Sequence, residues 1–195
     1  MKDIVFATHN PNKLAEIRQM LPEGLQVLSL DAIGCSEEIP ETANTLEGNA
    51  RLKASHVLEY YGYACFADDT GLEVAALNGA PGVYSARFAG PQADSLANTK
   101  KLLSLMEDET DRRARFRTVI ALVLEGAYHY FEGIVEGAIL REPTGTGGFG
   151  YDPVFRPAGY ACSFAEMPLA EKNRISHRGK AFQKLKEFLD KNLAL

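Results

Sequence analysis

A short apolar run that ends in two adjacent carboxylates lies near the middle of the chain. Residues 64–67 read Ala-Cys-Phe-Ala and lead directly into Asp68 and Asp69, which Thr70 and Gly71 follow. Such a run predicts a buried strand, and a carboxylate at the edge of a core is costly unless it meets a cation or hydrogen-bond donors. Asp, Thr and Gly are also ordinary turn residues. Taken alone, the stretch is better explained as a turn, so the interpretation depends on what the rest of the chain supplies.

The composition limits the class of protein. The chain has 195 residues, of which 46% are hydrophobic and 24% are charged, and its net charge is −5. This length can build a sizeable core in one domain or in two closely joined lobes. The acidic balance argues against a broad nucleic-acid-binding surface, and no apolar stretch approaches the length of a transmembrane helix.

The cysteines and the first residues favour a reducing compartment. Cys35, Cys65 and Cys162 are far apart, they show no metal-binding spacing, and their odd number argues against a disulfide framework. The chain becomes polar by Thr8, which argues against a signal peptide. We therefore expect a cytoplasmic protein that does not associate with membranes.

The N-terminal residues have the pattern of an anion-binding loop. Residues 4–7 predict a short buried strand, and a helix follows with Leu14, Ile17 and Leu21 on one face and Asn12 as its expected cap. A strand, a polar loop and a helix start bring backbone amides and the helix dipole toward an anion. A capped helix with a solvated lysine is the alternative. The polar loop consists of Thr8, His9, Asn10, Pro11, Asn12 and Lys13.

The next polar candidates lie in a loop and a helix. Residues 29–45 form a long acidic connection in which Glu41 is a candidate metal ligand, although a solvated acidic loop explains it equally well. A helix is expected from Thr45 to about residue 61. In this helix Asn49 and Lys53 are four residues apart, so their side chains can act together.

The second half of the chain predicts two long strands and a glycine-rich loop. Residues 115–125 alternate in polarity and residues 128–140 look like a hairpin partner, which suggests an antiparallel portion of the sheet. Residues 145–153 then hold four glycines in six positions, which permit unusual backbone shapes and close approach of a ligand. An aromatic side chain there can stack on a nucleobase or simply pack into the core. The candidate residues in the loop are Phe149, Gly150, Tyr151 and Asp152.

The C-terminal segment adds a cluster of cations before a closing helix. Ser176 is placed to cap that helix, so His177 and Arg178 fall in its first turn, where a cation opposes the helix dipole. This local conflict hints at an anionic or polar ligand. Together these elements predict a mixed α/β protein: an elongated mixed sheet flanked by helices, forming a single domain over residues 1–195 with two lobes and an active-site cleft between them.

Six segments in this order resemble the inosine triphosphate pyrophosphatase family over almost the whole chain. The segments are Thr8-x-Asn10-x-x-Lys13, Glu47-x-Asn49-Ala50-x-x-Lys53-Ala54, Ala67-Asp68-Asp69-Thr70-Gly71-Leu72, Pro81-Gly82-Val83-Tyr84-Ser85-Ala86-Arg87, Gly145-Thr146-Gly147-Gly148-Phe149-Gly150-Tyr151-Asp152-Pro153 and Ile175-Ser176-His177-Arg178-Gly179. Members of the family hydrolyse non-standard purine nucleoside triphosphates such as ITP, dITP and XTP. The resemblance therefore implies a purine nucleoside triphosphate as substrate, Mg²⁺ as cofactor and a homodimer.

The resemblance also implies roles for particular residues. Asp69 matches the proton acceptor and magnesium ligand, and Glu41 matches a second metal ligand, although Pro40 stands where the family often has another glutamate. Thr70 keeps the hydroxyl of the family's more usual serine. The residues that match substrate-binding positions are the loop Thr8 to Lys13, Lys53, Lys172, the base-binding segment Phe149 to Asp152, and the pair His177 and Arg178 that contacts the base edge.

Two other functions fit parts of the same pattern. A catalytically silent nucleotide-binding module would keep the glycine loop and the lysines, but it would not need the acidic pair with Glu41. A pyrophosphatase for pyrimidine or modified nucleotides, as in the septum-formation inhibitor family, has a related architecture. For the favoured function, a water attacks the α-phosphorus and pyrophosphate leaves, with Asp69 as base, metal ligand or both. Lys13, Lys53 and Lys172 are expected to hold the phosphate oxygens.

Overall fold

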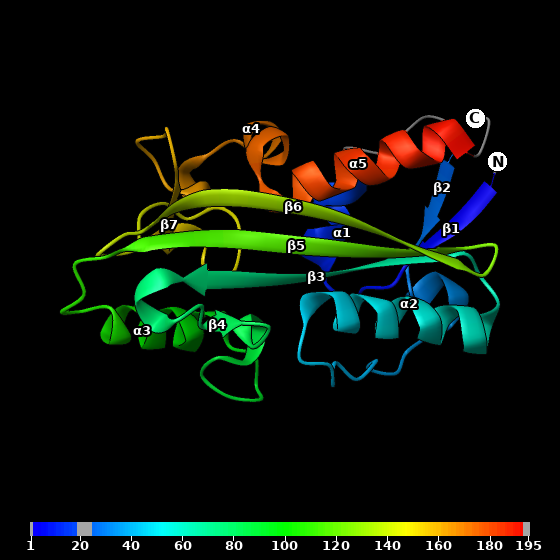
Figure 1. Ribbon diagram of the computed structural model, residues 1–195, viewed down its shortest axis with the longest axis horizontal. Helices are drawn as coiled ribbons and strands as arrows, with labels where there is room; N and C mark the ends of the chain where they lie inside the picture. Colours follow the sequence, from blue (N-terminus) through cyan, green and yellow to red (C-terminus); the bar gives the residue numbers. More distant parts are fainter. Residues whose placement is uncertain (1, 19–24, 193–195) are drawn as a thin grey trace. The chain divides into compact units, whose positions relative to one another are not determined.

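The computed structural model, drawn in Figure 1, describes residues 2–18 and 25–192. The chain divides into two compact units. The first unit contains the described residues of 1–69, 118–133 and 179–195. The second unit contains residues 70–117 and 134–178. Three long strands continue from one unit into the other, so each unit holds a part of one sheet.

The described residues form a seven-stranded sheet with helices packed on it, which confirms the predicted mixed α/β class. The strand order is β2-β1-β3-β5-β6-β7, and β4 pairs with β3. β1 lies parallel to β2 and β3, whereas β4 and β7 are antiparallel to their neighbours. The strands are β1 (Lys2–Phe6), β2 (Leu25–Leu28), β3 (Cys65–Val74), β4 (Pro81–Gly82), β5 (Arg113–Leu124), β6 (Ala127–Ile139) and β7 (Phe155–Pro157). The helices are α1 (Pro11–Arg18), α2 (Leu46–Tyr61), α3 (Ser95–Leu105), α4 (Leu169–Ile175) and α5 (His177–Asn192).

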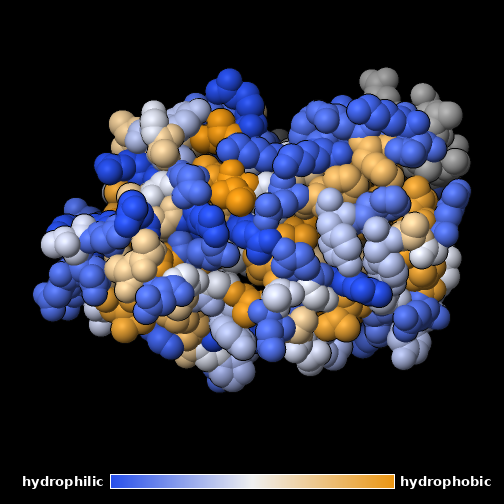
Figure 2. Space-filling view, viewed as in Figure 1, coloured by the Kyte–Doolittle hydropathy of each residue, from blue (hydrophilic) through white to orange (hydrophobic). Residues whose placement is uncertain are grey.

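In the first unit, both faces of the sheet are covered because β1 is apolar on both sides. Ile4 and Phe6 pack in one cluster with residues of α1 and α5, and Val5 and Ala7 pack in another with residues of α2. This is the alternation expected of a strand buried on both faces. The outer side of α5 carries hydrophilic side chains (Figure 2), so the helix is amphipathic. Leu21, which we expected on the inner face of the first helix, lies outside the described residues.

The strand that carries the two carboxylates is longer than the sequence suggests. β3 does not end at Asp68 but continues through Gly71 to Val74, so the interpretation of residues 68–71 as a turn is wrong. The extension is possible because β4 lies against it. A side chain at Gly71 would place a Cβ only 2.7 Å from the carbonyl oxygen of Gly82, so only glycine allows this approach.

Other local predictions are confirmed. β5 and β6 form the expected hairpin, joined by Glu125 and Gly126, which both have positive φ angles of 51° and 80°. Two such residues in a two-residue connection match the twist of the flanking strands. The helix expected from Thr45 to about residue 61 is α2, and the structure adds that Thr45 is its cap, because its side chain accepts a hydrogen bond from the amide of Gly48 at 3.0 Å. Among the described residues, no helix combines the length and the apolar character that crossing a bilayer requires.

The second unit has one aromatic core and one guanidinium that ties its segments together. Phe116, Phe155 and Phe164 pack with ring centroids 4.7–6.2 Å apart. Arg112 donates from its guanidinium to the carbonyl oxygens of Ile139 at 2.6 Å, Met106 at 2.7 Å and Leu140 at 2.8 Å. This one side chain satisfies carbonyls at the end of α3 and at the end of β6.

We predict that Arg112→Met lowers the free energy of unfolding by about 3 kcal/mol, because three carbonyl groups lose a charged donor. Urea denaturation of the purified protein measures the change. Arg113→Met is the matched control, since Arg113 is exposed and its guanidinium pairs with the neighbouring Asp111. The control should cost less than about 1 kcal/mol, and equal losses in the two variants would contradict the assigned role of Arg112.

Candidate functional site

Two buried carboxylates of β3 point to opposite faces of the sheet. Asp68 and Asp69 are adjacent in the strand, and they are only 2% and 7% exposed. On one side, Nζ of Lys13 in α1 lies 2.9 Å from the Asp68 carboxylate. On the other side, Nδ2 of Asn49 donates to Asp69 at 3.1 Å, and Nζ of Lys53 lies 3.8 Å from Asp69. Each carboxylate therefore meets a cation from the helix on its own side.

Lys53 joins Asp69 to the acidic loop. Its Nζ donates to Oε1 of Glu41 at 2.7 Å, so two carboxylates gather around one ammonium. Burial alone would lower the pKa of Lys53, but the carboxylates of Asp69 and Glu41 outweigh it and raise the pKa above its ordinary value. Burial raises the pKa of Asp69, and the Lys53 ammonium offsets this only in part. The folded protein therefore favours the ionised form of Asp69 less than water does.

The polar loop after β1 is ordered by its own side chains. Oδ1 of Asn10 accepts from the amides of Asn12 at 2.9 Å and Lys13 at 3.3 Å, so Asn10 caps α1 and the prediction of Asn12 as the cap is wrong. The amide of Asn10 in turn donates to Oγ1 of Thr8 at 3.1 Å. These amides are already bonded within the loop, so the side chain of Lys13 is the clearest anion-binding group that the loop presents.

The other loop positions differ in exposure. Thr8 and Asn10 are half-buried, whereas Pro11 and Asn12 are exposed at the start of α1. His9 is also exposed, and its Nε2 lies 3.0 Å from the carbonyl oxygen of Glu37 in the acidic loop. This contact connects the loop after β1 with the segment that leads to Glu41.

The second unit contains a buried ion pair of its own. Nζ of Lys172 in α4 lies 2.7 Å from Oδ2 of Asp152, and both side chains are 4% exposed. The same oxygen accepts the amide of Phe149 at 2.7 Å. Gly148, with a φ angle of 69°, makes room for this arrangement, because a Cβ there would collide with the Asp152 carboxylate. Asp152 therefore fixes both the glycine loop and the lysine.

The ring of Phe149 lies close to two cations. The Nζ of Lys172 is 5.0 Å and the Cζ of Arg178 is 5.3 Å from the ring centroid, within the range of cation–π attraction. Arg178 is only 3% exposed and lies in the first turn of α5, as predicted. The neighbouring His177 is also 3% exposed, and its ring stacks on Phe116 with centroids 4.5 Å apart.

Three further predicted site residues are described by their burial and hydrogen bonds. Tyr151 belongs to the aromatic core of the second unit, and its hydroxyl donates to the carbonyl oxygen of Ser85 at 2.8 Å. Gly150 is half-buried and its carbonyl accepts from Thr99 at 3.4 Å. Thr70 follows Asp69 in β3 and is half-buried.

The structure adds two residues that the predicted site did not include. Asn49 accepts the amide of Ala43 at 2.9 Å and donates to Asp69, so it links the acidic loop to the strand. Its four-residue spacing from Lys53 was the available signal. Asp68 pairs with Lys13, which the adjacency of the two aspartates indicated only as extra charge.

The donor atoms around Asp69 fit a hard divalent cation. Glu41 and Asp69 offer carboxylate oxygens to the same positive charge, and Glu41 keeps 23% of its side chain exposed. Mg²⁺ prefers oxygen ligands and commonly uses one or two carboxylates together with water and phosphate oxygens. These two residues would hold the ion.

We predict that Asp69→Asn raises the free energy of unfolding at neutral pH in the presence of a chelator, because the amide carries no charge that burial disfavours. The raised pKa means that stability falls as the pH rises from the ordinary pKa of a free aspartate to that of folded Asp69. The gain should therefore shrink as the pH approaches about 4. Urea denaturation as a function of pH measures it.

Asp111→Asn is the control, for which we expect the opposite change in the free energy of unfolding. The Arg113 guanidinium lowers the pKa of Asp111 to about 2, so this carboxylate stabilises the fold above its ordinary pKa. Asp111→Asn should lower stability at neutral pH. A loss of stability in Asp69→Asn under the same conditions would contradict the interpretation of the buried carboxylate.

Comparison with known proteins identifies the family. Residues 4–188 match the Ham1 family. A dITP/XTP pyrophosphatase of Christiangramia forsetii is 57% identical over 188 residues, which cover 96% of this chain and 99% of the relative. A protein of the same name from Porphyromonas gingivalis is 55% identical over 190 residues, with coverage of 97% and 98%. The solved structure of a HAM1 protein from Coxiella burnetii is 40% identical, covers 98% of this chain and 100% of that chain, and has a TM-score of 0.91. The resemblance seen in the sequence is thus confirmed, and the chain belongs to the Ham1 family.

Proposed function

We propose that this protein hydrolyses non-standard purine nucleoside triphosphates, such as ITP, dITP and XTP, to the monophosphate and pyrophosphate, and so removes them from the nucleotide pool. The relatives at 55–57% identity bear the name dITP/XTP pyrophosphatase. The structural observation that carries the proposal is the cluster around Asp69, where Glu41 and Asp69 gather at the Lys53 ammonium. A binding module without catalysis has no need of two carboxylates held in this way.

The cations of the first unit are suited to the triphosphate. Lys13 and Lys53 are largely buried, and each is held by carboxylates. A phosphate chain that displaced part of this pairing would keep both ammonium groups neutralised, so binding would exchange one anionic partner for another. In this proposal Lys13 and Lys53 hold phosphate oxygens, and the loop from Thr8 to Asn12, whose amides are bonded within the loop, borders the phosphates and positions Lys13.

Magnesium bound by Glu41 and Asp69 would supply charge neutralisation at the phosphates and a more acidic water. Asp69 also accepts a proton from the attacking water as the bond to the α-phosphorus forms and pyrophosphate leaves. Asn49 keeps the carboxylate oriented, because its amide holds Oδ2.

The second unit supplies the groups suited to the base. Phe149 offers a ring for stacking, which every base accepts and which therefore does not discriminate. Arg178 and His177 offer donors, and these favour a 6-oxo acceptor over the 6-amino group of adenine. The phosphate-binding role expected for Lys172 stays a prediction, since this lysine pairs with Asp152 and lies near the ring of Phe149. Thr70, Gly150, Tyr151 and Asp152 complete the proposed substrate-binding set, with Asp152 acting by holding Lys172 and the amide of Phe149.

The remaining parts of the proposal follow the family resemblance. We propose that the protein works as a homodimer in the cytoplasm, with neither nucleic acid nor a membrane as a partner. Light scattering coupled to size-exclusion chromatography would give the mass in solution, and a monomer under assay conditions would contradict the dimer without affecting the proposed activity.

The decisive assay compares ITP, dITP, XTP, GTP and ATP with Mg²⁺ and measures monophosphate and pyrophosphate separately. We expect rapid release of pyrophosphate from the first three substrates, little from ATP, and none after chelation of the metal. Asp69→Asn should abolish turnover while the far-ultraviolet circular dichroism stays unchanged. Binding of ITP without hydrolysis by the wild type would favour the silent module, and a preference for pyrimidine or modified nucleotides would favour the alternative pyrophosphatase.

Two variants should separate stacking from recognition of the base edge. Phe149→Leu should raise KM for ITP and for ATP alike, by about tenfold or more, because stacking is lost for both. Arg178→Ala should instead lower the ITP-to-ATP ratio of kcat/KM by about tenfold, because a donor to the 6-oxo group is lost. An unchanged ratio in Arg178→Ala would remove this residue from specificity.

A further inference from the structure

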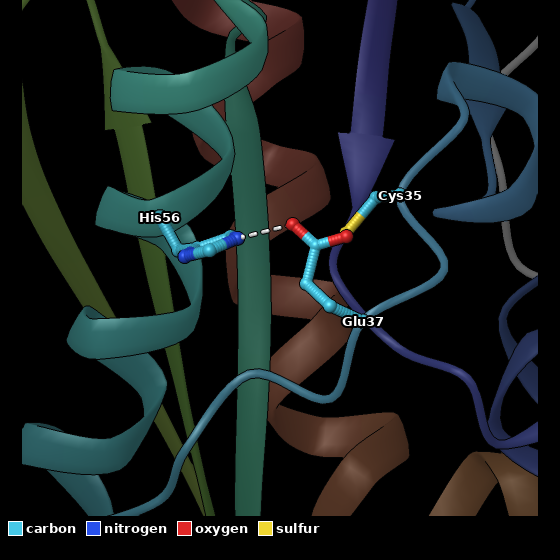
Figure 3. Close-up of side chains that lie close together, drawn as sticks. All are labelled: Cys35, Glu37 and His56. Carbon is cyan, nitrogen blue, oxygen red and sulfur yellow. Dashed lines mark hydrogen bonds and ion pairs between the residues drawn. The ribbon is translucent and has the colours of Figure 1, made fainter.

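Three potential metal ligands from two segments of the first unit lie together outside the proposed magnesium site. Cys35 and Glu37 lie in the acidic loop, and His56 lies in α2. One ligand atom of each residue lies within 4.8 Å of the corresponding atoms of the other two. Figure 3 shows the Glu37 carboxylate between the imidazole of His56 and the sulfur of Cys35. This group could not be predicted from the sequence, because Cys35 and His56 are not close in the chain and follow no metal-binding spacing.

The donor set is that of a borderline-soft cation. A thiolate, an imidazole and a carboxylate are all ligands that Zn²⁺ accepts, and three protein ligands leave a fourth position for water. Mg²⁺, by contrast, requires oxygen ligands. We propose that Cys35, Glu37 and His56 form a binding site for a soft divalent cation such as Zn²⁺, distinct from the magnesium site at Glu41 and Asp69.

The surroundings hold these ligands in place. Nε2 of His56 lies 3.0 Å from Oε1 of Glu37, a separation that suits two ligands of one ion. The hydroxyl of Tyr61 donates to the same carboxylate at 2.9 and 3.0 Å, and the ring of Tyr60 packs on His56 with centroids 4.6 Å apart. Partners of this kind orient metal ligands.

Cys35 is held in place by its own burial and by a backbone hydrogen bond. Its side chain is fully buried, and its amide donates to the carbonyl oxygen of Leu30 at 3.0 Å, at the end of a tight turn. The left-handed Gly34, with a φ angle of 78°, precedes it. The thiol is therefore presented by an ordered segment.

An ion at this position would fasten the acidic loop to α2. Glu37 is four residues before Glu41, and His56 is three residues after Lys53. Occupancy would therefore brace the two segments that form the Glu41–Lys53 ion pair. The proposal concerns metal binding only, and it stands or falls independently of the proposed hydrolase activity.

Cobalt substitution tests the site, because a thiolate bound to Co²⁺ gives a charge-transfer band in the near ultraviolet that oxygen ligands do not give. Metal-free protein is titrated with Co²⁺ in the presence of excess Mg²⁺, and bound Co²⁺ is then displaced with Zn²⁺. We expect the band in the wild type and its loss on addition of Zn²⁺. Cys35→Ser and His56→Gln should abolish it, and Tyr61→Phe should weaken Co²⁺ binding about tenfold.

Two controls separate this site from other ligands. Cys162→Ser removes the half-buried thiol of the second unit and should leave the band intact. Asp69→Asn, which impairs the proposed magnesium site, should also leave it intact. If no band forms in the wild type, or if the band survives in either Cys35→Ser or His56→Gln, whichever folds, then the three side chains form a hydrogen-bonded network only and the proposal is overturned.

Discussion

Burying two neighbouring carboxylates in one strand requires a cation on each side of the sheet. β3 meets this requirement because α1 supplies Lys13 to Asp68 and α2 supplies Lys53 to Asp69. Breaking either pair by removing the lysine would leave a buried charge uncompensated, which typically costs about 3–5 kcal/mol. The placement of both helices relative to β3 is thus tied to electrostatics as well as to the apolar clusters beneath them.

In the second unit, too, a buried carboxylate is paired with a lysine. Lys172 and Asp152 are buried as a pair, and the carboxylate also fixes the amide of Phe149. The pair therefore determines where the aromatic ring lies, and Lys172 and Arg178 then sit near that ring. In this unit the buried cations lie beside an aromatic ring as well as a carboxylate. In the first unit Lys13 and Lys53 pair with carboxylates.

Features of the fold that depend on neighbouring residues could be predicted from the sequence, whereas features that depend on contacts between distant segments could not. The strand at residues 4–7, the helix expected from Thr45 and the β5–β6 hairpin follow from local periodicity and turn chemistry, which can be recognised within a single segment. The extension of β3 through Gly71 could not be predicted locally, because it depends on the approach of Gly82 from another strand. The cap of α1 was misplaced by two residues, since Asn10 and Asn12 are equally good caps and only Pro11 between them favours the first.

The same distinction between local and distant information applies to the candidate site. The residue types followed from the family resemblance, but their partners did not. Tyr151 illustrates the limit: its place in the motif predicts contact with substrate, while its hydroxyl is bonded to the carbonyl of Ser85 within the core. Asn49 illustrates the reverse, because its link between Ala43 and Asp69 depends on a loop whose path no periodicity encodes.

The alternation of β3 has a consequence for how the gene can change. Inserting or deleting one residue of β3 before Asp68 would turn both carboxylates to the opposite faces of the sheet, away from the lysines that now balance them. Point substitutions can be tested by selection one at a time, but a frame-preserving indel in this strand would disrupt both ion pairs at once. We therefore expect length variation among homologous chains to spare this strand and to collect in exposed connections such as residues 107–111.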